Sequence, residues 1–160
     1  MGIFNYVGLF VIILIMIPNI VFALTNKDGF NNLYKNKKVK ILEQVGRYGC
    51  FIFMIVNVPY TYFNFWFNNA KLVYIIVNFT LVFLYLLFWI VFWKKSMLIK
   101  SLALTITPSI IFIFSGIMLQ NILLIFFAIV FVPTHILISY KNSKLSQNLW
   151  WIYYILYLQG

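Results

Sequence analysis

The sequence predicts an all-helical integral membrane protein: a bundle of five membrane-spanning helices, with a short interfacial helix at its C-terminus. Of the 160 residues, 64% are hydrophobic and only 9% are charged, whereas soluble domains carry about 25% charged residues. The apolar residues fall into runs of about 20, the length that a helix needs to cross a bilayer. Most of the basic residues lie between these runs. We therefore interpret residues 1–160 as a single polytopic membrane domain.

Five apolar segments are long enough to be spans. They comprise residues 3–24, 41–62, 72–93, 101–119 and 122–140. The third is the most clearly bounded, because Lys71 and Lys94 flank it and its final tryptophans suit a membrane interface. The last two are separated only by Gln120 and Asn121, which predicts a helical hairpin. Four spans would contain a proline, which removes one helical hydrogen bond. These prolines are Pro18, Pro59, Pro108 and Pro133.

The last apolar run, residues 149–158, is too short to be a sixth span. Its sequence is LWWIYYILYL, and as a helix it would extend about 15 Å, half the thickness of a membrane. The polar segment 141–148 separates it from the fifth span. We therefore expect residues 149–158 to form an interfacial or half-inserted helix of their own.

The distribution of basic residues predicts the orientation of the chain. Segments 25–40, 94–100 and 141–148 hold every lysine and arginine except Arg47 and Lys71. They alternate with two nearly uncharged connections, so the positive-inside bias places the N-terminus outside and the C-terminus in the cytoplasm. We expect a bacterial cytoplasmic membrane, with anionic lipid headgroups near the basic loops. The positive charge is spread over separate loops, so we expect no nucleic-acid partner.

Several polar side chains inside the spans are predicted to lie at a common depth. At 1.5 Å per residue they would sit about 7–10 Å below the inner membrane boundary. They are Asn19, Arg47, Thr105, Thr107 and His135. Glu43 precedes Arg47 by four residues, so the two can pair on one helix face. One interpretation is a cytoplasm-facing polar pocket. The other is that Arg47 reaches the headgroups and that the remaining residues bond neighbouring helices.

Other small and polar residues are interpreted as packing positions. Small residues permit close approach of membrane helices, and they share one face in two spans: Ser101, Thr105, Ser109 and Gly116 in one, Gly46 and Cys50 in the other. Asn57 and Asn78 would lie in the outer halves of neighbouring spans, where they could bond each other.

The sequence gives little support to an enzyme. It has one histidine and one cysteine, too few for an all-protein zinc site or a bis-histidine haem site, so we expect no cofactor or metal. The leading interpretation is a non-enzymatic accessory or interaction subunit whose partner is another membrane protein or a second copy. The alternative is a small carrier or a binding protein for hydrophobic or amphiphilic ligands, using the polar pocket.

Overall fold

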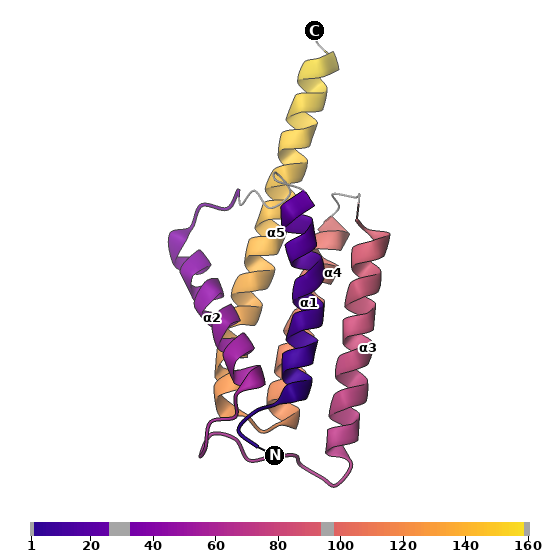
Figure 1. Cartoon of the computed structure of the whole chain (residues 1–160). Helices are drawn as coiled ribbons and strands as arrows, with labels where there is room; N and C mark the ends of the chain where they lie inside the picture. Colours follow the sequence, from indigo (N-terminus) through magenta and orange to yellow (C-terminus); the bar gives the residue numbers. More distant parts are fainter. Residues whose placement is uncertain (1, 26–32, 94–97, 159–160) are drawn as a thin grey trace.

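Five helices form one bundle in the computed structural model of the chain (Figure 1). The structure describes residues 2–25, 33–93 and 98–158, with side chains described as far as residue 148. The helices are α1 (Tyr6–Thr25), α2 (Lys37–Ile55), α3 (Ala70–Val91), α4 (Leu98–Met118) and α5 (Ile122–Leu158). In α1, α3, α4 and residues 122–148 of α5, length and apolar composition suffice to cross a membrane.

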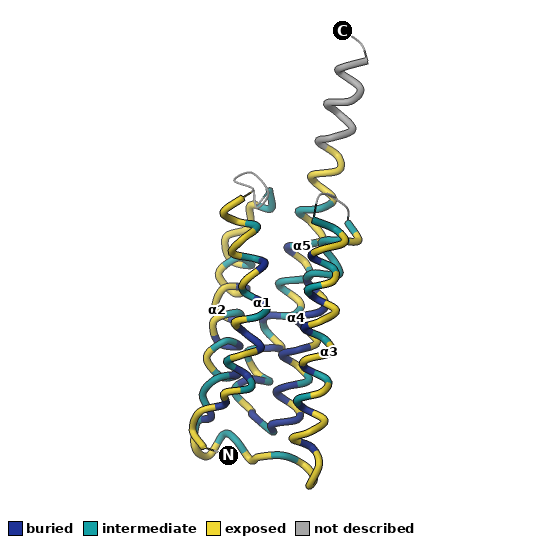
Figure 2. The backbone as a smooth tube through the Cα atoms, turned by 45° about the vertical axis from the view of Figure 1, so that its right-hand side comes forward, coloured by how far each residue is buried: buried dark blue, intermediate teal, exposed yellow. Residues whose placement is uncertain are grey.

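The helices follow one another around a ring. Helix α1 packs between α2 and α3, α2 packs on α5, and α4 lies between α5 and α3. Buried residues line the inside of this ring, and exposed residues cover its outside (Figure 2). We call the end that holds the α4–α5 turn the hairpin end, and the opposite end, from which α5 projects, the lysine end.

Helix α2 buries a carboxylate and small residues on its inner face and exposes apolar residues along its outer face. Glu43, Gly46 and Cys50 are buried, whereas Val45 and Ile52 are exposed. A soluble amphipathic helix has the reverse arrangement. Although several charged residues lower its overall hydropathy, α2 therefore presents the same kind of apolar outer surface as the other helices.

The predicted second span, 41–62, was wrong at both ends, because α2 covers residues 37–55. It begins early because the Asn36 side chain accepts hydrogen bonds from the backbone N–H groups of two residues in the first turn, which is a standard N-cap. It ends early because Pro59 disfavours helical backbone at the preceding residue. Val56 instead forms a bridge with Phe4 of the N-terminal segment. Pro59 thus lies outside the helices, unlike the other three prolines.

The prediction of a separate helix at residues 149–158 was also wrong, because α5 continues without a break to Leu158. Residues 141–148 contain no glycine or proline, so nothing in them stops the helix. At 1.5 Å per residue, its 37 residues extend about 55 Å, and the final part projects beyond the other helices (Figure 1). The side chains of 149–158 lie outside the described residues, so their interfacial placement stays a prediction.

The predicted hairpin between the last two helices is confirmed. Gln120 has a positive φ of 49° in the turn, and the side chain of Asn121 accepts a hydrogen bond from Leu124 N at the start of α5. The turn reverses the chain within three residues, between Met118 and Ile122.

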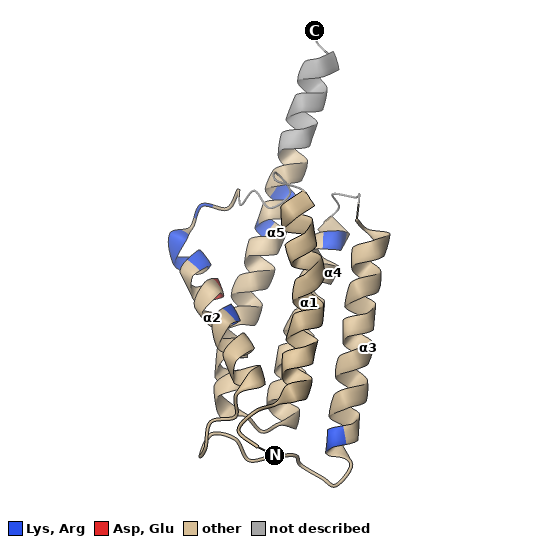
Figure 3. Cartoon of the chain, in the orientation of Figure 1, with Lys and Arg blue, Asp and Glu red and all other residues tan. Residues whose placement is uncertain are grey.

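Basic residues are concentrated at the lysine end (Figure 3). Lys71, at the start of α3, is the exception at the hairpin end, and Arg47 lies within the length of the bundle. Charge therefore divides the described part of the molecule into a basic end and a nearly neutral end, as the lysine pattern predicts.

Candidate functional site

Glu43 is the centre of a buried ionic cluster between α2 and α5. Arg47 Nη2 donates a hydrogen bond to Glu43 Oε1, and His135 Nδ1 lies 3.0 Å from the same oxygen. Glu43 is only 3% exposed, whereas the Arg47 side chain is 35% exposed. The structure thus brings together three of the residues that the sequence singles out.

Glycines in α2 position this cluster. A Cβ atom on Gly46 would lie 2.8 Å from the backbone of Phe131, and one on Gly49 would lie 2.2 Å from the Phe127 ring. Without side chains at these positions, α2 approaches α5 closely, as predicted for Gly46. His135 stacks on Phe131, with ring centroids 4.5 Å apart. The close contact and the stacked ring together hold the imidazole within bonding distance of the carboxylate.

Asn19 joins the cluster from α1 through a residue of α3 that the sequence analysis did not identify. Asn19 Nδ2 donates to the Tyr85 hydroxyl at 2.7 Å and to Ile15 O at 2.6 Å. The Arg47 guanidinium is close enough to Tyr85 to act on its hydroxyl electrostatically. Counted from the hairpin end, Asn19, Tyr85, Glu43 and His135 all lie about 20 Å along their helices.

The set formed by Asn19, Glu43, Arg47, Tyr85 and His135 is called the charged layer below. A buried tryptophan borders it. The Trp89 ring packs edge-on against the Tyr85 ring, with centroids 6.5 Å apart, and its N–H forms no hydrogen bond of ordinary geometry with any described residue. Aromatic residues are common in apolar spans, so the sequence alone does not indicate that Trp89 lies beside polar groups.

Thr105 and Thr107 lie about 17–20 Å from the hairpin end of α4, level with the charged layer, but do not bond it. Thr105 Oγ1 donates to Ser139 Oγ at 2.6 Å and to Ser101 O at 2.7 Å, so it fastens α4 to α5. Thr107 Oγ1 donates to Ala103 O of its own helix at 2.8 Å. The small-residue face predicted for this span does pack against α5, with Gly116 against Ile125.

A second cation lies toward the lysine end of the charged layer. Lys100 Nζ donates to Trp93 O at 3.1 Å. It also lies 4.7 Å from the centroid of the Phe22 ring and 5.5 Å from that of Trp89. Cations over aromatic faces are held by the ring quadrupole, so the Lys100 charge is fixed beside Trp89.

Near the hairpin end of the bundle, the buried polar side chains are neutral asparagines. Asn5 Nδ2 donates to Met54 O and to the Tyr74 hydroxyl, both at 3.1 Å, and Asn5 Oδ1 accepts from Gly8 N. Asn121 Nδ2 donates to Phe53 O at 2.9 Å. Each of these side chains therefore both donates and accepts, and each connects separate segments of the chain.

Asn78 completes this second set. Its Oδ1 accepts from Ser115 Oγ of α4 at 3.1 Å, and its Nδ2 donates to Tyr74 O at 2.9 Å. We call Asn5, Asn78 and Asn121 the asparagine layer. The predicted bond between Asn57 and Asn78 was wrong: Asn57 lies beyond the end of α2 and donates to Gly2 O at 3.2 Å.

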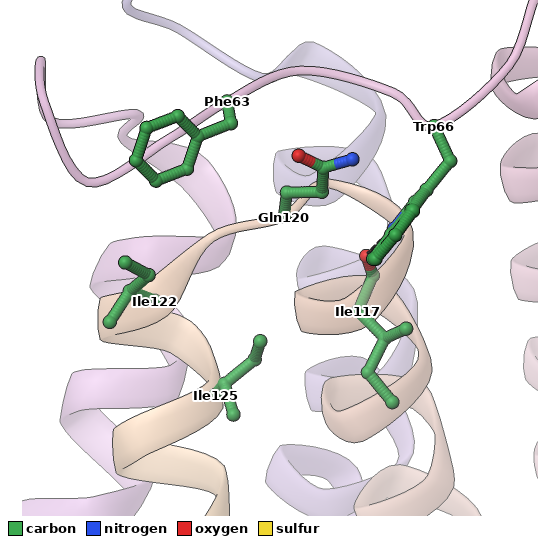
Figure 4. Close-up of a pocket in the computed structure, with 6 residues that line it drawn as sticks. All are labelled: Phe63, Trp66, Ile117, Gln120, Ile122 and Ile125. Atoms are coloured by element: carbon green, nitrogen blue, oxygen red, sulfur yellow. Dashed lines mark hydrogen bonds between the residues drawn. The ribbon is translucent and has the colours of Figure 1, made fainter.

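An apolar groove lies at the hairpin end and is separate from the charged layer (Figure 4). Its volume is about 300 Å³. It is lined by Phe63, Trp66, Ile117, Gln120, Ile122 and Ile125. The Trp66 N–H donates to Ile117 O at 2.6 Å, which holds the 56–69 connection against the end of α4. The lining contains no ionisable group.

Among the residues that the structure describes, no three histidine, cysteine or acidic side chains are grouped as metal ligands. Comparisons with protein-family models, with curated proteins and with solved structures gave no match.

Proposed function

We propose that this chain is a non-enzymatic protein of the bacterial cytoplasmic membrane that binds a small ligand in the charged layer. It crosses the membrane five times, with the hairpin end outside and the lysine end in the cytoplasm. The layer is reached from the cytoplasmic side, and the protein acts as a carrier or as a ligand-binding protein.

The observation that carries this proposal is the Glu43–Arg47–His135 cluster, in which the carboxylate is buried. Arginine or aspartate at the centre of a membrane helix costs about 2.5–3.5 kcal/mol on insertion scales. Neutral polar contacts between membrane helices stabilise by only about 0.6 kcal/mol on average. Packing alone does not require charges, because the asparagine layer fastens the same bundle without them. Ionisable groups inside spans usually face substrate pathways or water.

The exposed face of α2 supports the five-span topology. Ile41, Val45, Tyr48 and Ile52 are exposed along this helix, and water would leave this apolar stripe uncovered. Burial in lipid covers the stripe, while Glu43 faces the bundle. The α2 helix is 19 residues long, about 28 Å, which suffices for a span.

Labelling tests this topology. In a Cys50→Ser background, Lys37→Cys should react with an impermeant thiol reagent from the cytoplasm and Asn68→Cys from the outside. If both positions label from the same face, α2 does not cross the membrane.

Copurification tests ligand binding. The protein and a Glu43→Gln/Arg47→Gln variant are purified in parallel, and the small molecules extracted from each are compared by mass spectrometry. We expect at least one compound to accompany the protein and to be lost from the double variant. Thr107→Val, whose hydroxyl bonds only its own helix, should retain it. The same compounds at the same occupancy in all three proteins would contradict the proposal.

The length of α5 favours a second candidate, an accessory subunit. The helix continues about 27 Å past residue 140, beyond the other helices, and the sequence of that extension is aromatic and apolar at its end. Native mass spectrometry of the full chain, and of the chain ending at residue 148, distinguishes the two candidates. A polypeptide bound by the full chain alone would favour the accessory role.

A further inference from the structure

The charged layer and its border contain more hydrogen-bond donors than acceptors. Arginine has five N–H donors, and one bond to Glu43 is the only hydrogen bond that Arg47 donates within the described part of the chain. The Tyr85 oxygen accepts from Asn19, which leaves its own proton available. The buried Trp89 N–H is also unpaired among the described residues. Trp89 is 3% exposed, and donors buried to this extent are nearly always paired with protein or water.

The same region has an excess of positive charge. Arg47 and Lys100 carry two charges, whereas Glu43 is the single acidic residue of the described chain. Lys100 lies against the face of Trp89, so its charge is close to the unpaired N–H. A group that would satisfy these donors must be an acceptor, and the charge balance favours a negative one.

We propose that Arg47, Tyr85 and Trp89 bind the phosphate group of a ligand that enters from the lysine end. This inference rests on the proposed ligand-binding function and specifies its chemistry. Arginine pairs with phosphate and carboxylate through two parallel bonds, and an indole N–H or phenol adds a neutral donor. Two sources fit: the headgroup of a cytoplasmic-leaflet lipid, and a free anion in solution.

Trp89→Phe is the decisive variant, because it removes the unpaired donor and keeps a six-membered aromatic ring at the site. The smaller ring leaves a cavity in the core, so thermal stability without ligand should fall, and anion binding is measured as the further stabilisation that each probe adds to each variant. Loss of a hydrogen bond to a charged group should weaken anion binding by about ten- to a hundredfold. Trp66→Phe is the matched control: it loses a bond to Ile117 O at the hairpin end and should leave anion affinity unchanged.

Binding is measured on the full-length protein in nanodiscs of phosphatidylcholine. Inorganic phosphate is added to one series, and phosphatidylglycerol is incorporated into another. Thermal stability reports binding in both, and native mass spectrometry counts the bound lipid. Stabilisation by phosphatidylglycerol alone identifies a lipid headgroup as the ligand group. Stabilisation by phosphate in the neutral nanodisc identifies a free anion.

Failure of this inference is distinguishable from failure of the proposed function. If neither probe stabilises the protein, or if Trp89→Phe binds as tightly as the unchanged chain, the anion site is overturned. A neutral compound that copurifies, and is lost from the Glu43→Gln/Arg47→Gln variant, would then still support ligand binding. Loss of affinity in Trp66→Phe equal to that in Trp89→Phe would also overturn the anion site.

Discussion

The asparagine layer and the charged layer lie in the same bundle but satisfy their polar groups differently. Near the hairpin end, Asn5, Asn78 and Asn121 each both donate and accept hydrogen bonds, and each forms one or more bonds to another segment of the chain. About 20 Å from that end, Glu43 accepts a hydrogen bond from Arg47 and lies 3.0 Å from His135 Nδ1. The buried Trp89 N–H has no described partner, and Arg47 donates no other described hydrogen bond.

This difference suggests different roles for the two layers: the asparagine layer joins the helices, and the charged layer serves the function. Neutral amides are sufficient to join the helices and leave few donors unmatched. The charged layer costs more to bury and leaves donors available, so its residues are poorly explained by packing. We therefore expect the asparagine layer to contribute more to stability than to activity, and the charged layer to do the reverse.

Removing one partner from the charged layer should have the largest effect. Glu43→Leu leaves Arg47 without its carboxylate, and breaking a buried pair in this way costs about 3–5 kcal/mol. Because Arg47 is partly exposed, we expect a loss near the lower limit in the free energy of unfolding, measured with denaturant in detergent.

Removing both charges distinguishes a functional layer from a structural one. Glu43→Leu/Arg47→Met should recover most of that loss, because apolar replacement of a buried pair is often neutral or stabilising. If the double variant is as unstable as the single one, the charges are needed for folding and the contrast between the layers is lost.

Adding a side chain at Gly46, where α2 packs closely on α5, should have the next largest effect on stability. The Cβ of Gly46→Ala would meet the Phe131 backbone, which cannot rotate away, so α2 and α5 must separate. Overpacking of this kind costs about 1–3 kcal/mol, and the separation should also weaken the Glu43–His135 contact. Gly2→Ala is the control, since no heavy atom lies within 4 Å of the position that its Cβ would occupy. Equal destabilisation in thermal unfolding would contradict the tight contact.

Replacing an asparagine of the asparagine layer by alanine should lower the thermal stability of the protein. Asn121→Ala removes the cap of α5 and the bond to Phe53 O, and loss of an N-cap alone costs about 0.5–2 kcal/mol. Asn69 occupies the same position before α3 but makes no side-chain cap bond. Asn69→Ala should therefore change the thermal midpoint much less than Asn121→Ala. A comparable shift in both would mean that the cap does not stabilise α5.

The smallest effect is expected at the threonines. Thr105→Val removes the bond to Ser139 on α5, and we expect about 0.6 kcal/mol, the average for such contacts in membranes. Thr107→Val should be close to neutral, because its hydroxyl bonds only Ala103 O. Unfolding of both variants in the same detergent gives the difference directly, and a larger loss at position 107 would refute this assignment.

The sequence predicted the all-helical class and the hairpin because both depend on the length and spacing of apolar runs. It misplaced the ends of α2 because the effect of Asn36 as a cap, and of Pro59 as a stop, outweighed hydropathy. It divided α5 because residues 141–148 are polar, although they contain no helix breaker. The five-span count and the orientation remain predictions.

The charged layer was only partly predictable. The spacing of Glu43 and Arg47 places them on one helix face, and counting residues gives the depth of His135. Depth does not give the rotation of a helix, so Thr105 was grouped with residues that it does not bond. Tyr85 was missed because the chain has 11 tyrosines and 18 phenylalanines, and neither composition nor spacing distinguishes one that borders a polar site.

Water accessibility of the two layers tests the central claim most directly. In a Cys50→Ser background, single cysteines replace Arg47 and Asn19 in the charged layer, and Asn78 and Ser115 around the asparagine layer. Each variant is treated with a water-soluble thiol reagent from the cytoplasmic side. We predict rapid reaction at positions 47 and 19 and protection at positions 78 and 115, both of which are fully buried. Equal protection at all four positions would mean that both layers are dry packing contacts, which would contradict the functional distinction between them.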